Sequence, residues 1–510
     1  MNYPVWELAM GSGMLIAVVS VLHVFVSHFA VGGGLWLVVT EIKARRSGDT
    51  KLRQFVKDHS RFFMLLTLVF GAISGVGIWA TIGLISPHGT SALIHAYLWG
   101  WAIEWVFFFV EIGAAMVYYY GWDRLDDRTH ETVGWIYFIA AYMSLVVING
   151  IITFMLTPGG WLENQDFWTG FFNPTYWPSL AIRTFAGLAI AGLMTLFFAT
   201  RLPQDTFRRR LQRWNGGWAV VALIGVAASA LWYGRSVGVW EQNEALSGAI
   251  TVLPTVAALF KGGLIVLTIL AVLVWLWPAL TRRAPAVLLL VLALGTMGAG
   301  EWMREAGRKP YTIHGYLYST GMLVEQEEWF ADNGMAAGTR WLSPAGATDE
   351  VRRGRDLYVA WCQPCHTQGG YNGLQPYLAH WNRETVASLV PRLASMRALM
   401  PPWHGNAAEN DALVTYLMTL KPEATAVWGT DGYGPAQAFA ISCGLCHTPD
   451  GFRELTSSFA GMDPAEIDEF LDEAGDLVDE MPGYFGPPEQ RALLVEYLAG
   501  LGASAEGSGS

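Results

Sequence analysis

Cysteine and charged residues are both scarce in this chain. Only four of its 510 residues are cysteines, and only 15% are charged. All four cysteines fall in two short segments, which leaves none for a further thiol site elsewhere. Basic residues do not outnumber acidic ones, since the net charge is −11. A nucleic-acid partner, which needs a basic surface, is therefore not expected. Apolar residues take the place of charge and make up 53% of the chain.

Long apolar stretches fill the chain before residue 306, and each is long enough to cross a bilayer, which takes about 20 residues. The first stretch is too long and too poorly flanked to be a cleavable signal peptide. The sequence therefore predicts an integral membrane protein with about eight spans. These spans are expected near residues 13–42, 60–85, 92–120, 131–157, 178–200, 217–234, 252–280 and 284–306.

The loops between the spans differ in charge from one side to the other. "EIKARRSGDTKLRQFVKDHSR" after the first span and "RLPQDTFRRRLQR" after the fifth are basic, whereas "GGWLENQDFWTGFFNPTYW" is aromatic and carries neither lysine nor arginine. The positive-inside rule then puts both ends of the eight-span core outside the cytoplasm. We expect a multi-pass protein of the bacterial inner membrane with its C-terminal part in the periplasm.

The four cysteines form two copies of one pattern. "WCQPCHTQGG" (361–370) and "SCGLCHTPDG" (442–451) each contain Cys-x-x-Cys-His, the attachment signature of c-type haem. Two thiols bind the porphyrin as thioethers and the adjacent histidine ligates the iron. A zinc site would need about four converging ligands, and here all four cysteines belong to the two Cys-x-x-Cys-His motifs. The cofactor prediction is thus two covalent c-type haems, held by Cys362, Cys365 and His366 and by Cys443, Cys446 and His447.

The composition changes after Arg308. A polar connector is expected at 312–347, followed by two similar units at 348–421 and 432–502. In each unit a short helix is expected to carry the cysteines, a loop follows, and a Met-Pro pair precedes a final amphipathic helix. These units resemble class I cytochrome c domains. The resemblance implies that Met400 and Met481 are the second iron ligands, and such His/Met-ligated haems carry electrons rather than bind gas.

The second unit is strongly acidic. Between 432 and 502 it has thirteen Asp or Glu residues against two arginines. Such a face would steer a basic, soluble cytochrome c toward the haem. A merely solvated helix face remains an equal alternative.

The membrane part carries a second resemblance. "IEWVFFFVEIGAAMVYYYGWDRL" (103–125), "REAGRKPYTIHGYL" (304–317) and, more loosely, "LHVFVSHFAVGGGLWLVVTE" (22–41) resemble segments of subunit I of cytochrome bd-type oxygen reductases. The resemblance covers about residues 5–318. It implies a cytochrome bd-like core over residues 1–311 with one or two b- or d-type haems.

Several site residues follow from this resemblance. It implies that His23 and Glu305 serve two high-spin haems, that Arg308 holds propionates or the geometry of Glu305, and that Glu104 and Glu111 deliver protons. Glu104 is displaced by one residue from its family position. At about 1.5 Å per residue, His23 lies about 15 Å deep and Glu305 near the outer end of the eighth span, so both can face one cavity.

The two glutamates also stand out without the resemblance. Carboxylates at bilayer depth are costly and functional by default, and seven residues place Glu104 and Glu111 on one helix face. A pair of carboxylates satisfied by neighbouring side chains is the alternative. Among the other histidines, His28 is expected in the core or an interface, and His59 and His130 in cytoplasmic loops.

The chain departs from the family at the low-spin haem. The family holds that haem between a histidine on the fifth span and a methionine on the seventh. Here Arg183 and Gly263 stand at those places, and the long quinol-oxidising loop is missing. The resemblance therefore implies that the quinol site and its haem are lost. Arg183 and Lys261 are left to pair with haem propionates or to extend to the membrane interface.

The resulting prediction is an all-α membrane helix bundle with two C-terminal cytochrome c-like domains. It would act as an oxidoreductase that passes electrons from a periplasmic donor, such as a soluble cytochrome c, to a membrane haem that reduces oxygen to water. The alternative is an electron-transfer or anchor subunit of a larger respiratory complex without oxygen chemistry. Nitric oxide as the substrate also stays open. Membrane lipid and a second bd-like subunit are the further expected partners.

Overall fold

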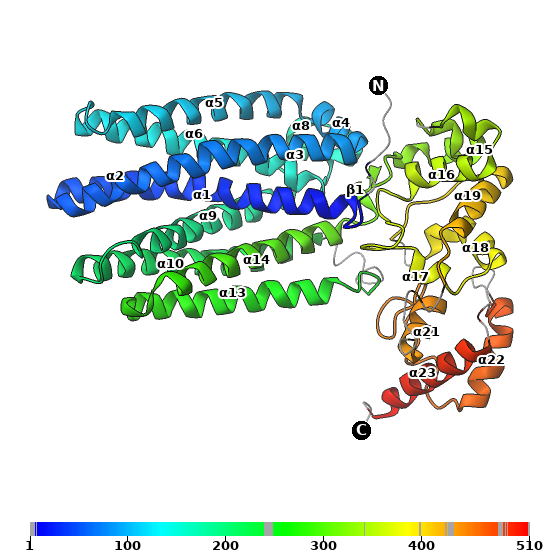
Figure 1. The fold of residues 1–510 in the computed structure, drawn as a ribbon. Helices are drawn as coiled ribbons and strands as arrows, with labels where there is room; N and C mark the ends of the chain where they lie inside the picture. The colour runs from blue at the N-terminus through cyan, green and yellow to red at the C-terminus, as the bar shows by residue number, and fades with distance from the viewer. Residues whose placement is uncertain are drawn as a thin grey trace.

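The computed structural model shows a long helical bundle with two smaller helical units at one end (Figure 1). It describes the chain except residues 1–5, 7, 239–247, 341, 397–398, 424–425, 427–432, 478–482, 485, 487 and 508–510.

The described part of the chain contains eight helices long and apolar enough to cross a membrane, as predicted. The second is one continuous span, Thr50–Ile85, in which a π-helical turn, η1 (Leu65–Gly71), joins α2 (Thr50–Met64) to α3 (Ala72–Ile85). The other seven are α1 (Ser12–Ser47), α5 (Leu98–Gly121), α6 (Asp127–Phe154), α9 (Tyr176–Ala199), α10 (Thr206–Ser236), α13 (Leu253–Leu276) and α14 (Arg283–Gly307). Short elements between the spans are α4 (Pro87–Ala96), α7 (Trp161–Asn164), α8 (Phe167–Phe171) and η2 (Pro278–Leu280).

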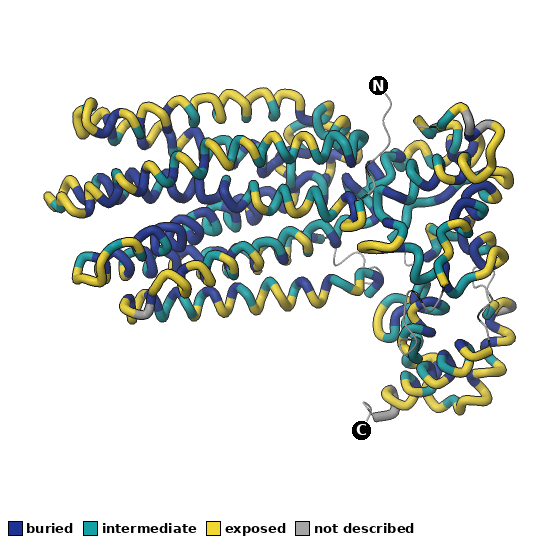
Figure 2. Tube along the Cα trace, viewed as in Figure 1, coloured by how far each residue is buried: buried dark blue, intermediate teal, exposed yellow. Residues whose placement is uncertain are grey.

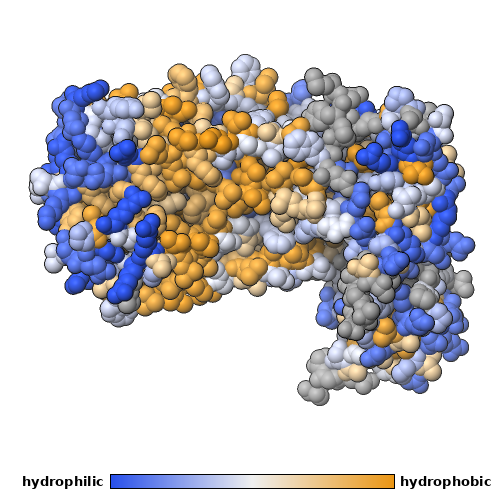
Figure 3. Space-filling view, in the orientation of Figure 1, coloured by the Kyte–Doolittle hydropathy of each residue, from blue (hydrophilic) through white to orange (hydrophobic). Residues whose placement is uncertain are grey.

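The outer faces of the bundle are apolar. Large side chains such as Ile73, Val76 and Trp105 are exposed, and exposed residues follow the outward faces of the helices (Figure 2). An apolar band covers the bundle between a hydrophilic end and the C-terminal units (Figure 3). Large exposed apolar surfaces of this kind mark contact with lipid or with another membrane protein.

Small residues allow the central helices to approach closely. A Cβ atom on Gly32 of α1 would lie 2.0 Å from the carbonyl oxygen of Gly187 on α9. The two backbones therefore touch at this crossing, as is common where small residues line helix interfaces in membranes. Around it Phe29 and Trp36 are fully buried.

Two histidines lie elsewhere than the sequence suggested. The prediction that His59 and His130 sit in loops is wrong, because α2 and α6 begin before them and both side chains are buried. His59 is surrounded by aromatic rings, with Phe55 stacked at 6.1 Å. His130 Nδ1 is 2.6 Å from Glu41 Oε1 on α1. Both helices extend past the apolar windows, so hydropathy alone marked their polar turns as loops.

The connector is built into the first C-terminal unit. It forms a small hairpin, β1 (Tyr311–Ile313) paired antiparallel with β2 (Leu317–Tyr318). Phe330 and Met335, which follow the hairpin, are buried in the apolar cluster of that unit. The connector elements are η3 (Val324–Gln326), α15 (Glu327–Asn333), η4 (Ala336–Gly338) and η5 (Pro344–Ala347).

Each C-terminal unit has its own apolar cluster. In the first, α16 packs against α19, and a Cβ atom on Gly354 would lie 1.9 Å from the carbonyl oxygen of Ala412. In the second, α21 packs against α23. The elements of both units are α16 (Glu350–Trp361), α17 (Gln375–Leu378), α18 (Arg383–Leu389), η6 (Val390–Ser395), α19 (Ala407–Thr419), α21 (Pro435–Ser442), α22 (Pro464–Leu477) and α23 (Pro488–Gly507).

Gly32→Leu should destabilise the bundle, because its side chain would collide with the backbone of α9 at Gly187. Overpacking a core costs about 1–3 kcal/mol, so we expect a lower Tm of the purified protein in detergent, measured by tryptophan fluorescence. Gly262→Leu is the matched control, since nothing lies within 4 Å of a Cβ at that position. Equal Tm values for the two variants would contradict the close crossing.

Candidate functional site

One cavity connects the bundle to the C-terminal units. Its volume is about 1630 Å³, larger than a typical small-molecule pocket, which measures about 300–1,000 Å³. Its walls come from α1, α3, α4, α5, α6, α9, α13 and α14 in the bundle, from the connector and from the first cytochrome c-like unit. It also reaches Gly444 and Leu445, between the paired cysteines of the second unit.

His23 lies on α1 at the wall of this cavity. Ser74 Oγ is 3.0 Å from its Nδ1, and the Ser74 hydroxyl donates its proton to the carbonyl oxygen of Phe70. The Ser74 oxygen therefore accepts the Nδ1 proton, which puts the imidazole lone pair on Nε2, the nitrogen that would ligate a metal. Ser27 Oγ lies 3.1 Å from Nε2 and 3.0 Å from the carbonyl oxygen of His23, so a haem iron would take the place of Ser27 at Nε2. Gly75 faces the ring, where a Cβ atom would lie 3.2 Å from Cε1. This arrangement fits a haem ligand.

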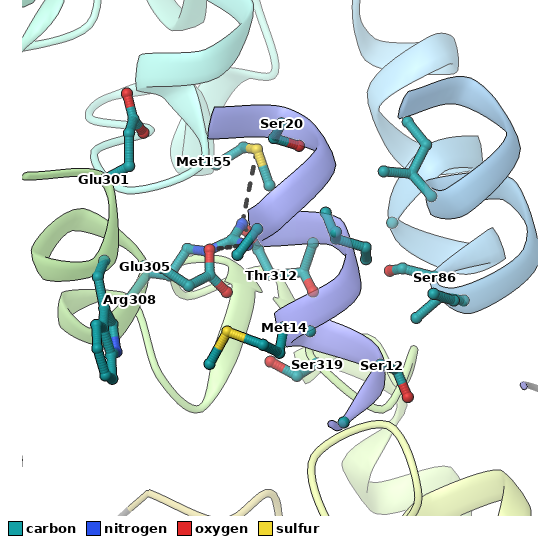
Figure 4. A pocket seen from close by; sticks show the side chains of 18 of the residues that line it. Ser12, Met14, Ser20, Ser86, Met155, Glu301, Glu305, Arg308, Thr312 and Ser319 are labelled. Carbon is teal, nitrogen blue, oxygen red and sulfur yellow. Dashed lines mark hydrogen bonds and ion pairs between the residues drawn. The ribbon is translucent and has the colours of Figure 1, made fainter. Parts of the chain in front are cut away.

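Glu305 lies at the end of α14, on the same cavity. Its carboxylate forms ion pairs with Arg308 and, at 3.4 Å, with Lys309 Nζ. Arg308 is held in turn, because its Nη1 donates to the carbonyl oxygen of Thr312 at 2.7 Å and lies 3.6 Å from Met155 Sδ (Figure 4). Glu305 is thus paired with an arginine that is itself held by a backbone carbonyl, which is compatible with one of the two roles expected of Arg308; the other, holding propionates, stays a prediction.

Glu104 and Glu111 both line the cavity from α5. Glu104 accepts a hydrogen bond of 2.8 Å from Ser144, and Glu111 accepts one of 3.1 Å from Tyr137. Seven residues of α-helix separate the two carboxylates by about 10 Å along the axis. Each is therefore satisfied by a neighbour and also in contact with the cavity, so both predicted readings describe part of their environment.

The residues at the two places that the resemblance assigns to the low-spin haem ligands do not offer those ligands. Arg183 is only 7% exposed, and its Nη2 donates to Glu301 Oε1 at 3.1 Å. Gly263 packs directly on α14, where a Cβ atom would lie 2.3 Å from Thr296 Oγ1. A methionine does not fit there, and Arg183 cannot serve as the opposite ligand, so these residues do not fit a low-spin haem. Arg183 does not extend to the interface, whereas Lys261 is exposed.

Glu301 and Arg304 were missed by sequence reasoning. Both belong to α14, and Arg304 Nε donates to Glu301 Oε2 at 2.9 Å. A carboxylate four residues before Glu305 in an apolar span was the available signal, since intramembrane carboxylates are functional by default.

The first Cys-x-x-Cys-His segment and the methionine predicted to be its second iron ligand both face the cavity. Cys362, Cys365, His366 and Met400 all line it. His366 Nδ1 lies 3.1 Å from the carbonyl oxygen of Asn372, which directs Nε2 toward the cavity as an iron ligand requires. Burial lowers the pKa of His366 and raises the pKa of the Cys362 thiol to about 12. These four residues fit a His/Met-ligated c-type haem.

The second segment has the same local geometry. His447 Nδ1 lies 2.8 Å from the carbonyl oxygen of Arg453, and burial raises the pKa of Cys443 to about 12. Cys446 follows Cys443 in the same turn, where its backbone N–H donates to the Cys443 carbonyl at 3.0 Å. Met481 lies outside the described residues, so its predicted role stays a prediction.

Both units touch the bundle. The backbone N–H of Tyr371 donates to the carbonyl oxygen of Ala9 at 3.0 Å, directly before α1. A Cβ atom on Gly370 would lie 1.7 Å from the same oxygen. In the second unit a Cβ atom on Gly248, before α13, would lie 2.4 Å from the backbone nitrogen of Phe452. The haem-binding loops are thus the contact points with the membrane part.

Two family models match separate parts of the chain, and the first match ends before α13 and α14. Residues 12–249 match the family model of cytochrome bd terminal oxidase subunit I, and residues 349–417 match that of cytochrome c oxidase, cbb3-type, subunit III. The bd oxidase structure from Geobacillus thermodenitrificans is similar over 60% of this chain and 88% of its own, with 17% identity and a TM-score of 0.53. No curated protein matches significantly.

The chain is therefore a multi-pass membrane haem protein of the oxidoreductase class. More particularly, it joins a membrane core of cytochrome bd subunit I type to C-terminal cytochrome c, as its motifs indicated. The predicted all-α fold is confirmed. The cytochrome c family model covers the first of the two units.

Gly370→Val should separate the first cytochrome c unit from the start of α1, because its side chain would displace Ala9. We expect faster hydrogen exchange at the Tyr371 amide, by about tenfold for each 1.4 kcal/mol of protection lost, with the c-haem spectrum unchanged. Gly13→Ala is the control, since nothing lies within 4 Å of a Cβ there. Unchanged exchange at Tyr371 would show that this contact does not hold the two parts together.

Proposed function

We propose that this protein receives electrons at its cytochrome c units and uses them to reduce oxygen to water at a high-spin haem in the membrane cavity. The observation that carries the proposal is one cavity that is lined by His23 and Glu305 from the bundle and by His366 and Met400 from the first cytochrome c unit. When bound there, the membrane haem supplies an open iron position for oxygen. Four electrons and four protons convert one oxygen molecule into two waters.

The chain's own residues would hold the cofactors. Cys362, Cys365 and His366 attach one c-type haem, and Cys443, Cys446 and His447 attach a second. His23 and Glu305 serve the one or two b- or d-type haems of the core, with Arg308 keeping Glu305 oriented. The closed low-spin site supports an electron input at the cytochrome c end, because quinol oxidation through that site is lost.

Glu111 and Glu104 would bring protons to this cavity. Tyr137 positions Glu111 and Ser144 positions Glu104, and both carboxylates reach the cavity wall. Carboxylates about 10 Å apart can pass protons through intervening water, as in the proton relays of other membrane proteins.

The membrane orientation and the donor follow from charge. Arg45 lies in the last turn of α1, and Arg53 and Lys57 lie in the first half of α2. The junction of α1 with α2 is at the end of the bundle opposite the cytochrome c units (Figure 1). The positive-inside rule then makes the cytochrome c units periplasmic. Exposed carboxylates on α22, including Glu466, Glu469 and Glu473, favour a basic soluble cytochrome c as the donor.

The test is the carbon monoxide difference spectrum of the dithionite-reduced, purified protein. We expect a band from a high-spin b or d haem in the native protein, and its loss in His23→Ala and Glu305→Ala, because both residues face the haem cavity. His95→Ala should keep the band, since His95 is exposed and does not line the cavity.

If only c-type haem is present and carbon monoxide changes nothing, the oxidase function is wrong. The chain would then be an electron-transfer or anchor subunit of a larger respiratory complex. Comparing turnover with oxygen and with nitric oxide would identify the acceptor where the band is present.

Glu111→Gln should slow oxygen consumption about a hundredfold, because an amide cannot relay a proton and such groups contribute about 10²–10⁴-fold. The carbon monoxide band should remain, since Glu111 holds no haem in this proposal. Glu163→Gln, at an exposed carboxylate of the short helix α7, is the control. Normal turnover in Glu111→Gln would remove this residue from the proton path.

A further inference from the structure

A group of charged side chains lies at the cavity where α9 meets α14. On α14 the charged residues at positions 301, 304, 305 and 308 are spaced by three and four residues, so they share one face of the helix. Arg183 of α9 faces them and pairs with Glu301. We name this group the arginine cluster; it consists of Arg183, Glu301, Arg304, Glu305, Arg308 and Lys309, and all six line the cavity.

The arginine cluster has more positive than negative groups. Three arginines and a lysine face two carboxylates, so the surplus is two positive charges. Glu301 is shared by Arg183 at 3.1 Å and Arg304 at 2.9 Å, although one arginine would neutralise it. Buried charge without a partner is expensive, so a site with two surplus cations is suited to anions.

Unused hydrogen-bond donors make the same point independently of charge. Arg183 Nε, Arg304 Nη1 and Arg308 Nε are buried without a hydrogen-bond partner. The Arg183 side chain is only 9% exposed, so water does not readily satisfy it. Buried donors in proteins are nearly always paired, and an arginine fork matches a carboxylate in two parallel hydrogen bonds.

We propose that the arginine cluster is a carboxylate-binding site for the two propionates of the haem held in the membrane cavity, with Arg183 and Arg304 as its specific contacts. The two surplus charges equal the charge of two propionates. This inference rests on the proposed function only in requiring a haem in the cavity, not in requiring oxygen reduction. Where the family has a histidine that ligates the haem iron, Arg183 would instead bind the propionate groups at the edge of a haem.

The first test measures haem retention. Non-covalent haem is transferred from the purified holoprotein to excess apomyoglobin and followed by absorbance, while the covalent c-type haem stays behind as an internal standard of protein amount. We expect Arg183→Gln and Arg304→Gln to release haem about tenfold faster, the effect of losing one charge-assisted hydrogen-bonded pair. Arg183→Lys, which keeps the charge and loses the fork, should lie between them and the native protein.

The control is Arg208→Gln. Arg208 is also a buried arginine, but its guanidinium donates to the carbonyl oxygens of Leu202 and Thr281 and does not line the cavity. Its substitution should leave haem release unchanged. Folding is not expected to fail in either cluster variant, because Glu301 keeps one arginine partner in each.

The second test identifies the source of the carboxylate. After haem has been removed, the native protein is titrated with haem and with haem dimethyl ester, in which both propionates are blocked. We expect the native protein to prefer haem about tenfold or more, and Arg183→Gln to lose much of that preference. Equal binding of haem and its ester by the native protein would overturn the proposal and leave another anion, such as a lipid headgroup, as the partner.

Native-like haem release from both cluster variants would also overturn the proposal. Failure of the proposed function looks different. A native protein that holds haem with the expected dependence on Arg183, yet consumes no oxygen, leaves the arginine cluster assigned and removes only the oxidase activity. If the native protein holds no transferable haem at all, both the oxidase function and the propionate role of the arginine cluster are wrong.

Discussion

Ionisable side chains inside an apolar bundle need partners, and this constraint organises the membrane part of the protein. Charge in the bilayer is tolerated where it is paired or faces a polar cavity. Glu41 is satisfied by His130 and Tyr118 at one end of the bundle. Glu104 and Glu111 combine a single neighbour with access to the cavity. The contrast separates a carboxylate that is fully enclosed by protein from two carboxylates that also face the cavity.

The first cytochrome c unit is attached to the bundle beside the cavity. The cavity opens at the end of the bundle where α1 begins and α14 ends. The Cys-x-x-Cys-His loop of the first unit closes over this opening through Tyr371 and Ala9. The connector adds Phe330 and Met335 to the apolar cluster of that unit, so the unit is joined to α14 by a packed segment and not by a flexible linker. Attachment through the haem-binding loops brings the cofactor sites together, which a distant tether would not do.

Features that depend on a short stretch of sequence, such as membrane spans and motifs, could be predicted from the sequence. Hydropathy predicted eight spans, and Cys-x-x-Cys-His predicted the haem-binding loops. Contacts between distant helices were not readable in the same way. Nothing near Gly263 in the sequence indicates that Thr296 fills the space beside it, and nothing near Arg183 indicates Glu301. His59 and His130 were misplaced for a related reason, because helices that continue beyond the apolar window carry polar turns that resemble loops.

The loss of the low-spin haem and the gain of the cytochrome c units form one change under the proposed function. A substituted ligand alone would leave an empty, polar gap in the bundle, and such a gap destabilises a packed core. Here Thr296 of α14 closes the side next to Gly263, and on the other side Arg183 pairs with Glu301 at the wall of the cavity. Returning a histidine to position 183 would not reopen the site, because Thr296 would still occupy the opposite side. Under the proposed function, electrons then enter the cavity from the first cytochrome c unit, whose Cys-x-x-Cys-His residues line it. The absence of low-spin haem ligands in the bundle and the attachment of cytochrome c units at the cavity are therefore explained together by that proposal.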